Sequence, residues 1–368
     1  MDNRIWKRFE KLSKIDSISF KEREFCDALK IELEDLGIST FEDDAGEKIQ
    51  GNSGNLFGFV AGALDKPPLL LSAHMDTVEP GNGIEAVIDE EGIITSVGDT
   101  ILGADDLSGI VIILEAIQRL KEQNIPHRPL ELLFTVSEER SCLGSANADY
   151  SKLKAKEAYT FDLGGPTGSA SNAAPTIMSF EITVNGKAAH AGVSPELGIH
   201  AIKTAASAVA RLPLGKPEAG ISLNVGKISG GGATNVVPDK CVVVGEIRGD
   251  AHEAALGYWD IVQGIFEEET KKVGATFDAK SNVGVKAYNT PFDSPVIKRF
   301  ERACSKVGAT PNIVATLGGS DQNNYALHGI EGIVVAGSMY DVHGINEYAK
   351  LDELEKAVEL LTVIILDD

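Results

Sequence analysis

Four short apolar segments of this chain are each followed by an acidic or histidine side chain, and this pattern limits the folds that the chain can adopt. The segments are rich in Leu, Val and Ile and span 69–73, 130–136, 158–161 and 333–336. Continuous apolar runs of this length are typical of strands buried on both faces of a parallel sheet. Polar side chains after such strands lie at the carboxyl edge, where open α/β sheets place their sites.

Helical patterns lie between these segments. Apolar side chains recur at helical spacing across 107–121, and a second apolar stripe runs from 351 to 365. Strands that alternate with helices favour an α/β fold with a mostly parallel, doubly wound sheet covered on both faces.

The stretch 176–283 has a different order of elements, βαββαβ, which is the order of a ferredoxin-like α+β sandwich. Its expected elements are a strand at 177–184, a helix at 198–212, strands at 221–228 and 240–248, a helix at 252–273 and a strand at 276–283. We therefore expect one domain from residues 1–172 and 288–368, with a second domain, 173–287, inserted into it.

Charge and composition exclude several kinds of partner. The chain has 34 basic and 55 acidic residues and a net charge of -21, so phosphate backbones and anionic membranes would repel most of its surface. No run approaches the roughly 20 apolar residues of a membrane span, and the first residues lack a signal-peptide pattern. Four scattered cysteines suggest reduced thiols. We expect a cytoplasmic protein that binds neither nucleic acid nor membranes.

The polar residues at the predicted strand ends each have an ordinary structural interpretation. A lone His74 or His343 is more often structural than a ligand, Asp105 and Asp106 can cap the helix that follows, and a glutamate pair can be a solvated strand end. The set as a whole has the composition of a metal centre: His74, Asp76, Asp105, Glu138, Glu139, Asp162 and His343.

Charge balance favours two metal ions in such a centre. Asp105, Glu139 and Asp162 bring three negative charges, and a bridging hydroxide would bring a fourth, so two divalent cations would be neutralised. Glu138 is then free to take a proton from an activated water and pass it to a leaving amine. Asp76 would orient His74. Histidine and carboxylate ligands accept Zn²⁺, Mn²⁺ or Co²⁺, so the ligand types alone leave the metal open.

Motifs along nearly the whole chain resemble the two-zinc exopeptidases and deacylases that include peptidase T, aminoacylase and glutamate carboxypeptidase. They are SAHMDT, LGADDLSG, FTVSEE, TFDLGG, NGKAAHAG, TNVVPD, LGGSD and VHGINE. GADDLSG and HGINEY are the elements most similar to the peptidase T-like branch.

The resemblance implies a role for each residue of the centre. His74 and Asp162 would bind one zinc, Glu139 and His343 the other, and Asp105 would bridge them. Glu138 would be the base, Asp76 the orienting acid, and the peptide bond between Asp105 and Asp106 would be cis.

The resemblance also makes the inserted domain a dimerisation domain and the protein a homodimer. It implies that the following residues contact the peptide substrate: His190, reaching across the dimer, Asn235, Arg248, Gly319, Ser320 and Asp321. From sequence, Arg248 could equally form a structural ion pair, although its guanidinium fork suits a substrate C-terminal carboxylate.

The expected activity is removal of the N-terminal residue from short peptides, tripeptides above all. Arg140 and Ser141 follow the glutamate pair where peptidase T relatives usually have Ile-Gly, and Ala191 replaces the proline after His190, so the resemblance implies a paralogue with altered specificity. Two alternatives stay open: an amidohydrolase or carboxypeptidase of the same family, and a non-catalytic metal-binding dimer. An uncoordinated Glu138 argues against the latter.

Overall fold

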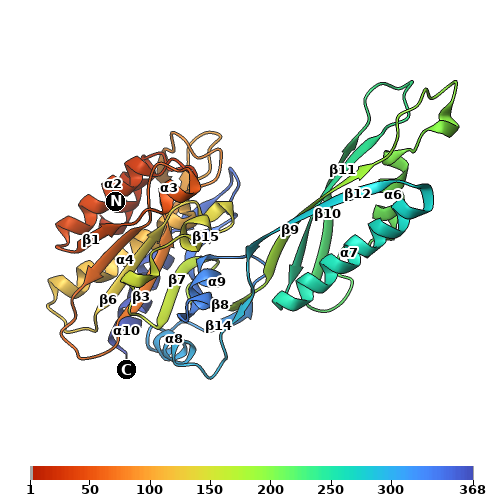
Figure 1. Cartoon of the computed structure of the whole chain (residues 1–368). Coiled ribbons are helices and arrows are strands. Elements are labelled where there is room, and N and C mark those ends of the chain that lie inside the picture. The colour runs from red at the N-terminus through yellow and green to blue at the C-terminus, as the bar shows by residue number, and fades with distance from the viewer. Residues whose placement is uncertain (1–2, 368) are drawn as a thin grey trace. The chain divides into compact units, whose positions relative to one another are not determined.

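The apolar segments form the centre of a twelve-stranded sheet in a computed structural model that describes residues 3–367 (Figure 1). Strands β6 (Leu130–Thr135), β3 (Leu69–His74), β7 (Glu157–Gly164) and β15 (Glu331–Tyr340) are neighbours in that order and run parallel. Their carboxyl ends therefore lie along one edge of the sheet.

Antiparallel strands extend this parallel centre on both sides. On one side lie β2 (Leu56–Val60) and β1 (Ser39–Glu42), and on the other β16 (Tyr348–Lys350), β5 (Ile93–Ser96) and β4 (Ala86–Ile88). Strand β8 (Ser169–Ala174) pairs with β15, β14 (Asn312–Ala315) and β13 (Tyr288–Asn289).

Both faces of the sheet are buried, as the continuous apolar runs predict. Along β3, Leu69 and Leu71 join one core, and Leu70 joins another on the opposite face. The larger core is completed by α1 (Arg4–Ser13), α2 (Arg23–Asp35), α4 (Ala104–Glu122), α8 (Pro295–Lys306) and α10 (Leu351–Leu366). Tyr325 of α9 (Asp321–Leu327) packs in the smaller core. The helices α3 (Ala45–Ile49) and α5 (Leu143–Ala146) are short and belong to the same unit. The predicted α/β fold is confirmed.

The contacts between residues divide the chain into two units. The first unit contains the chain up to Ala173 and again from Asn289, and the second unit is Ala174–Tyr288. Figure 1 shows β9 and β12 as the strands through which the chain enters and leaves the second unit.

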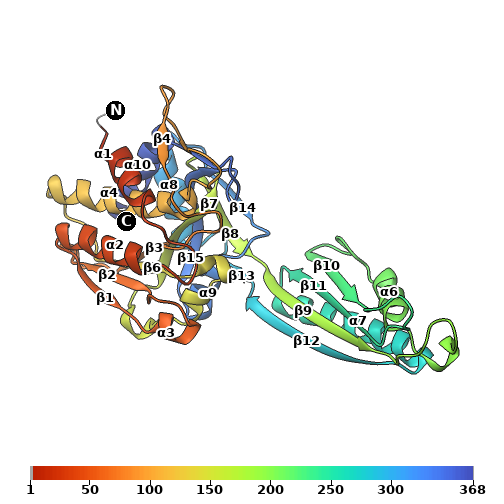
Figure 2. The ribbon, with the colours of Figure 1, turned by 90° about the horizontal axis from the view of Figure 1, so that it is seen from above.

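The second unit is an antiparallel sheet in the order β10–β11–β9–β12, with α6 (Ala201–Arg211) and α7 (His252–Val273) on one face (Figure 2). Its strands are β9 (Thr176–Asn185), β10 (Ile221–Gly230), β11 (Lys240–Gly249) and β12 (Thr276–Val285). Alternate side chains of β9, from Met178 to Val184, pack under the helices, as expected of a sheet with one buried face. The predicted βαββαβ order is confirmed.

No helix within residues 3–367 combines the length and apolarity needed to cross a lipid bilayer.

Candidate metal centre

Side chains from four neighbouring strand ends meet at the carboxyl edge of the parallel strands. His74 ends β3, Asp162 lies near the end of β7, and Glu138 and Glu139 form a 3-10 turn after β6. His343 follows β15 with a left-handed backbone, at φ 65°. The topology thus brings together residues that are far apart in sequence.

The start of α4 places Asp105 in the same space. The peptide bond between Asp105 and Asp106 is cis, as expected, and neither residue has helical backbone angles. Asp106 caps the helix instead, because its Oδ1 accepts the Gly109 N–H at 3.1 Å, and its Oδ2 accepts the His74 N–H at 3.1 Å. Asp105 is therefore free to face the two histidines.

The two carboxylate oxygens of Asp105 face different histidines. Its Oδ1 lies 3.0 Å from His74 Nε2, and its Oδ2 lies 3.2 Å from His343 Nε2. Beyond this carboxylate, His74 Nε2 is 3.9 Å from Asp162 Oδ1, and His343 Nε2 is 2.8 Å from Glu139 Oε1. One carboxylate thus lies between two pairs, each made of a histidine and a second acid.

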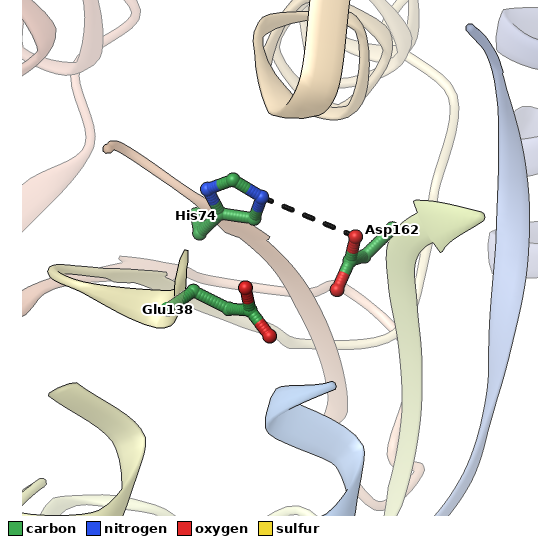
Figure 3. Close-up of side chains that lie close together, drawn as sticks. All are labelled: His74, Glu138 and Asp162. Atoms are coloured by element: carbon green, nitrogen blue, oxygen red, sulfur yellow. Dashed lines mark ion pairs between the residues drawn. The ribbon is translucent and has the colours of Figure 1, made fainter. Parts of the chain in front are cut away.

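Candidate ligand atoms around His74 fall into two overlapping groups. His74, Asp105 and Glu139 form one group, and His74, Glu138 and Asp162 the other, with the atoms of each group within 4.8 Å of one another. Figure 3 shows the His74 ring and the carboxylates of Glu138 and Asp162 directed into one common space. This spacing suits coordination by imidazole nitrogen and carboxylate oxygen.

The electrostatics of the site fit bound cations. Burial and neighbouring acids raise the pKa of Glu138 and Asp162 well above the usual carboxyl range. The carboxylates of Asp105 and Glu139 raise the pKa of His343 to about 10. Glu139 Oε1 is buried and accepts no hydrogen bond of acceptable geometry, although His343 Nε2 is close to it. Buried carboxylates crowded in this way are costly unless positive charge is present, so the donor set fits divalent metal ions.

The Asp76 carboxylate supports the glutamate turn as well as facing His74. Its Oδ1 accepts the Glu138 N–H at 2.8 Å, and its Oδ2 accepts the Glu139 N–H at 3.3 Å and the Ser19 hydroxyl at 2.8 Å. His74 Nδ1 lies 2.8 Å from the Asp76 backbone carbonyl and 3.5 Å from the Asp76 carboxylate. The carbonyl is therefore the closer partner of the histidine.

Of the predicted substrate contacts, three lie in the first unit. Gly319 and Ser320 precede α9, and the Ser320 N–H donates to Asn323 Oδ1 at 3.0 Å. Asp321 is 1% exposed, accepts the hydroxyls of Thr135 and Ser145, and forms a further group of candidate ligands with Glu138 and Cys142. Asp321, the first residue of α9, thus lies beside Glu138.

The other three predicted substrate contacts belong to the second unit. The Ala191 N–H donates to the Asn235 carbonyl, and His190 Nδ1 accepts the N–H groups of Gly192 and Val193 at 3.2 Å each. Arg248, on β11, donates from Nε to Glu246 at 2.6 Å. This unit brings His190 next to Asn235.

Sequence reasoning missed several residues that support the site. Glu347 accepts the N–H groups of Leu102, Gly103 and Asp105, at 2.8, 2.8 and 3.0 Å. Glu22 accepts the N–H and hydroxyl of Ser137, the residue before the glutamate pair. Glu347 lies in the HGINEY motif, which could have identified it as a site residue. Glu22 lies in a loop that contains no such motif.

Comparison with known proteins agrees with this fold. The model of the peptidase family M20/M25/M40 matches residues 70–367. An uncharacterised protein, YqjE, of Bacillus subtilis is 34% identical over 364 residues, which cover 99% of this chain and 98% of YqjE.

Two solved structures are similar over almost their full lengths. Aminopeptidase PepT from Bacillus cereus has 37% identity and a TM-score of 0.93. A tripeptidase from Staphylococcus aureus has 30% identity and a TM-score of 0.96. In both comparisons the match covers 98% of this chain and 97% of the other. The protein is therefore a peptidase hydrolase, and the chain belongs to the peptidase family M20/M25/M40.

Proposed function

We propose that the protein is a two-metal aminopeptidase that removes the N-terminal residue from short peptides, tripeptides above all. The observation that carries the proposal is the Asp105 carboxylate, whose two oxygens face His74 and His343 separately. Similarity to an aminopeptidase and to a tripeptidase supports the choice of substrate.

The distances support the proposed ligand set. His74 and Asp162 would hold one ion, Glu139 and His343 would hold the other, and Asp105 would bridge them. When bound, divalent ions supply Lewis acidity for the peptide carbonyl and acidify water. Nitrogen and oxygen ligands suit Zn²⁺, with Mn²⁺ and Co²⁺ as alternatives.

Glu138 is the proposed proton carrier of the reaction. Its carboxylate reaches the space beside His74 and Asp162, and the residue is 9% exposed, so it is largely shielded from bulk water. It would take a proton from the attacking water and return it to the leaving amine, as general base and then general acid. The N–H bonds of this turn to Asp76 hold its backbone in place.

We also propose that the protein works as a cytoplasmic homodimer joined through the second unit. Four free, buried cysteines agree with a reducing compartment. His190 accepts backbone N–H groups at Nδ1, so its neutral ring carries the proton on Nε2 and can donate to a substrate oxygen. Sedimentation equilibrium would test the dimer, and a monomer at every practical concentration would remove the role of His190 across it.

The substrate proposal is tested by mass spectrometry of products from three peptides. Zinc-loaded protein is incubated with a free tripeptide, its N-acetylated form and its C-amidated form. The proposal requires loss of the N-terminal residue from the peptides with a free amine, and no reaction with the acetylated form. Cleavage of only the acetylated peptide would indicate a deacylase, and cleavage from the C-terminus would indicate a carboxypeptidase.

A further inference from the structure

The thiol of Cys142 contacts the carboxylate of Glu138. Cys142 is 2% exposed, and its Sγ donates to Glu138 Oε1 at 3.1 Å. Within residues 3–367 this thiol is the one side-chain donor to that carboxylate. The thiol is therefore placed to orient the Glu138 carboxylate.

The thiol is held in place by the backbone around it. The Cys142 N–H donates to the Glu138 carbonyl at 2.7 Å, which closes a tight turn from one residue to the other. The Cys142 carbonyl accepts from Asn324 Nδ2 at 3.2 Å and from the Ser145 hydroxyl at 3.2 Å. Cys142 has a left-handed backbone, at φ 57°, an uncommon conformation for a residue with a side chain. The backbone that carries the thiol is thus held by Asn324 and Ser145 as well as by the Glu138 carbonyl.

A third metal ion is a poor explanation for this cluster, although Glu138, Cys142 and Asp321 are close enough to share one. Asp321 already accepts two hydroxyls, from Thr135 and Ser145, and the thiol already donates to Glu138. Burial and the nearby acids raise the pKa of the Cys142 thiol well above its usual value, so it stays protonated. A protonated thiol is a donor and a poor ligand.

We propose that Cys142 is a positioning residue for Glu138. Its S–H group holds one carboxylate oxygen and leaves the other to accept the proton from water. The proposal rests on the function proposed above, in which Glu138 is the general base.

The weakness of a thiol donor suits this task. A strong hydrogen bond to the ionised carboxylate would stabilise the charged form and make Glu138 a poorer base. A thiol is a weak donor, so it can orient the carboxylate while leaving most of its basicity.

Kinetics of three variants test the proposal. Cys142→Ala should lower kcat about tenfold and leave KM within about twofold, because a bond to a group that acts in the chemical step is lost. Cys142→Ser, which keeps a donor but a stronger one, should recover only part of that loss. Cys304→Ala removes another buried thiol, on α8, and should change neither constant.

Two kinetic outcomes would overturn the proposal. One is a wild-type kcat in Cys142→Ala. The other is an equal loss in Cys142→Ala and Cys142→Ser together with loss of bound metal, which would mean that the thiol only supports the fold.

A second measurement needs no activity. The S–H stretching band of Cys142, assigned from the infrared difference between the wild type and Cys142→Ser, should move to higher frequency in Glu138→Gln, because the charged acceptor is lost. An unchanged band would rule out the bond. If wild-type protein cleaved no peptide while the band still moved, the proposed function would fail and the contact would stand.

Discussion

At the scale of single residues, Asp76 has a wider role than orienting a histidine. Its carboxylate accepts the N–H groups of Glu138 and Glu139, so it fixes the turn that carries both the proposed base and a proposed ligand. The sequence pattern HMD predicts an acid beside His74 but contains no sign of the contact with a turn 62 residues away. Contacts of this kind depend on which strands become neighbours.

Replacement of Asp76 by Asn should therefore lower both activity and metal affinity, by about 10- to 100-fold, as for other residues that support metal ligands. The amide offers one acceptor oxygen where the carboxylate offers two. Titration of metal content and steady-state kinetics would measure the two effects. Asp43→Asn is a matched control, since Asp43 accepts N–H groups from Ala45 and Asn55 away from the site, and its kcat should be unchanged.

At the scale of elements, the buried strands of the parallel centre were predictable and the short turns between the elements were not. β3 and β6 begin where the apolar runs begin, because burial on both faces leaves a continuous signal. The turn from Ser137 to Cys142 contains three left-handed residues that are not glycine, and no residue preference predicts that. The contact between Cys142 and Glu138 follows from this turn and was missed for the same reason.

The loop before β16 is joined to the start of α4 through Glu347. Glu347→Gln should reduce the free energy of unfolding by about 1–3 kcal/mol, since one amide oxygen cannot serve the three backbone N–H groups that the carboxylate accepts. Urea denaturation would measure the loss. Glu359→Gln, an exposed position on α10, should have no measurable effect, and an equal loss in both variants would contradict this account.

Strand β1 is tied to α2 by ion pairs from Glu42 to Arg23 and Lys30. Burial opposes the charge of Glu42, but Arg23, Lys30 and the Gly54 N–H outweigh it and lower its pKa from 4.5 to about 2. A lowered pKa stabilises the folded state above pH 4.5, and the effect is lost as the pH falls from 4.5 towards 2.

Glu42→Gln should accordingly cost about 1–2 kcal/mol at pH 7, since partial exposure of the ion pairs reduces the effect. The difference from wild type, measured by urea denaturation, should shrink as the pH is lowered below 4.5. Glu10→Gln, which removes an exposed pair with Lys14, should cost much less. A difference that grows towards low pH would contradict the assignment.

At the scale of the whole molecule, the two units have separate hydrophobic cores. The sheet of the first unit is enclosed by cores that contain no residue of the second, and the second has its own core between its sheet, α6 and α7. The order of the elements predicted a second kind of fold in this part of the chain, because βαββαβ differs from the alternation of strands and helices elsewhere. The sequence contains no comparable pattern that predicts how two chains would associate.

Metal removal should therefore lower the stability of the first unit alone. Ions bound only to the folded first unit stabilise it by about 2.7 kcal/mol per site at a free concentration 100 times the Kd. Calorimetry with and without a chelator should move the thermal transition of the first unit to lower temperature and leave that of the second unit in place. Equal shifts of both transitions would contradict this separation.

The central claim is that Glu138 moves protons and does not hold metal. Metal content and tripeptide turnover, measured together on Glu138→Gln, test it most directly. The variant should retain two ions per chain and lose at least about 100-fold in kcat, whereas Glu139→Gln should lose bound metal. A Glu138→Gln enzyme with wild-type turnover, or one that has lost its metal, would contradict the claim.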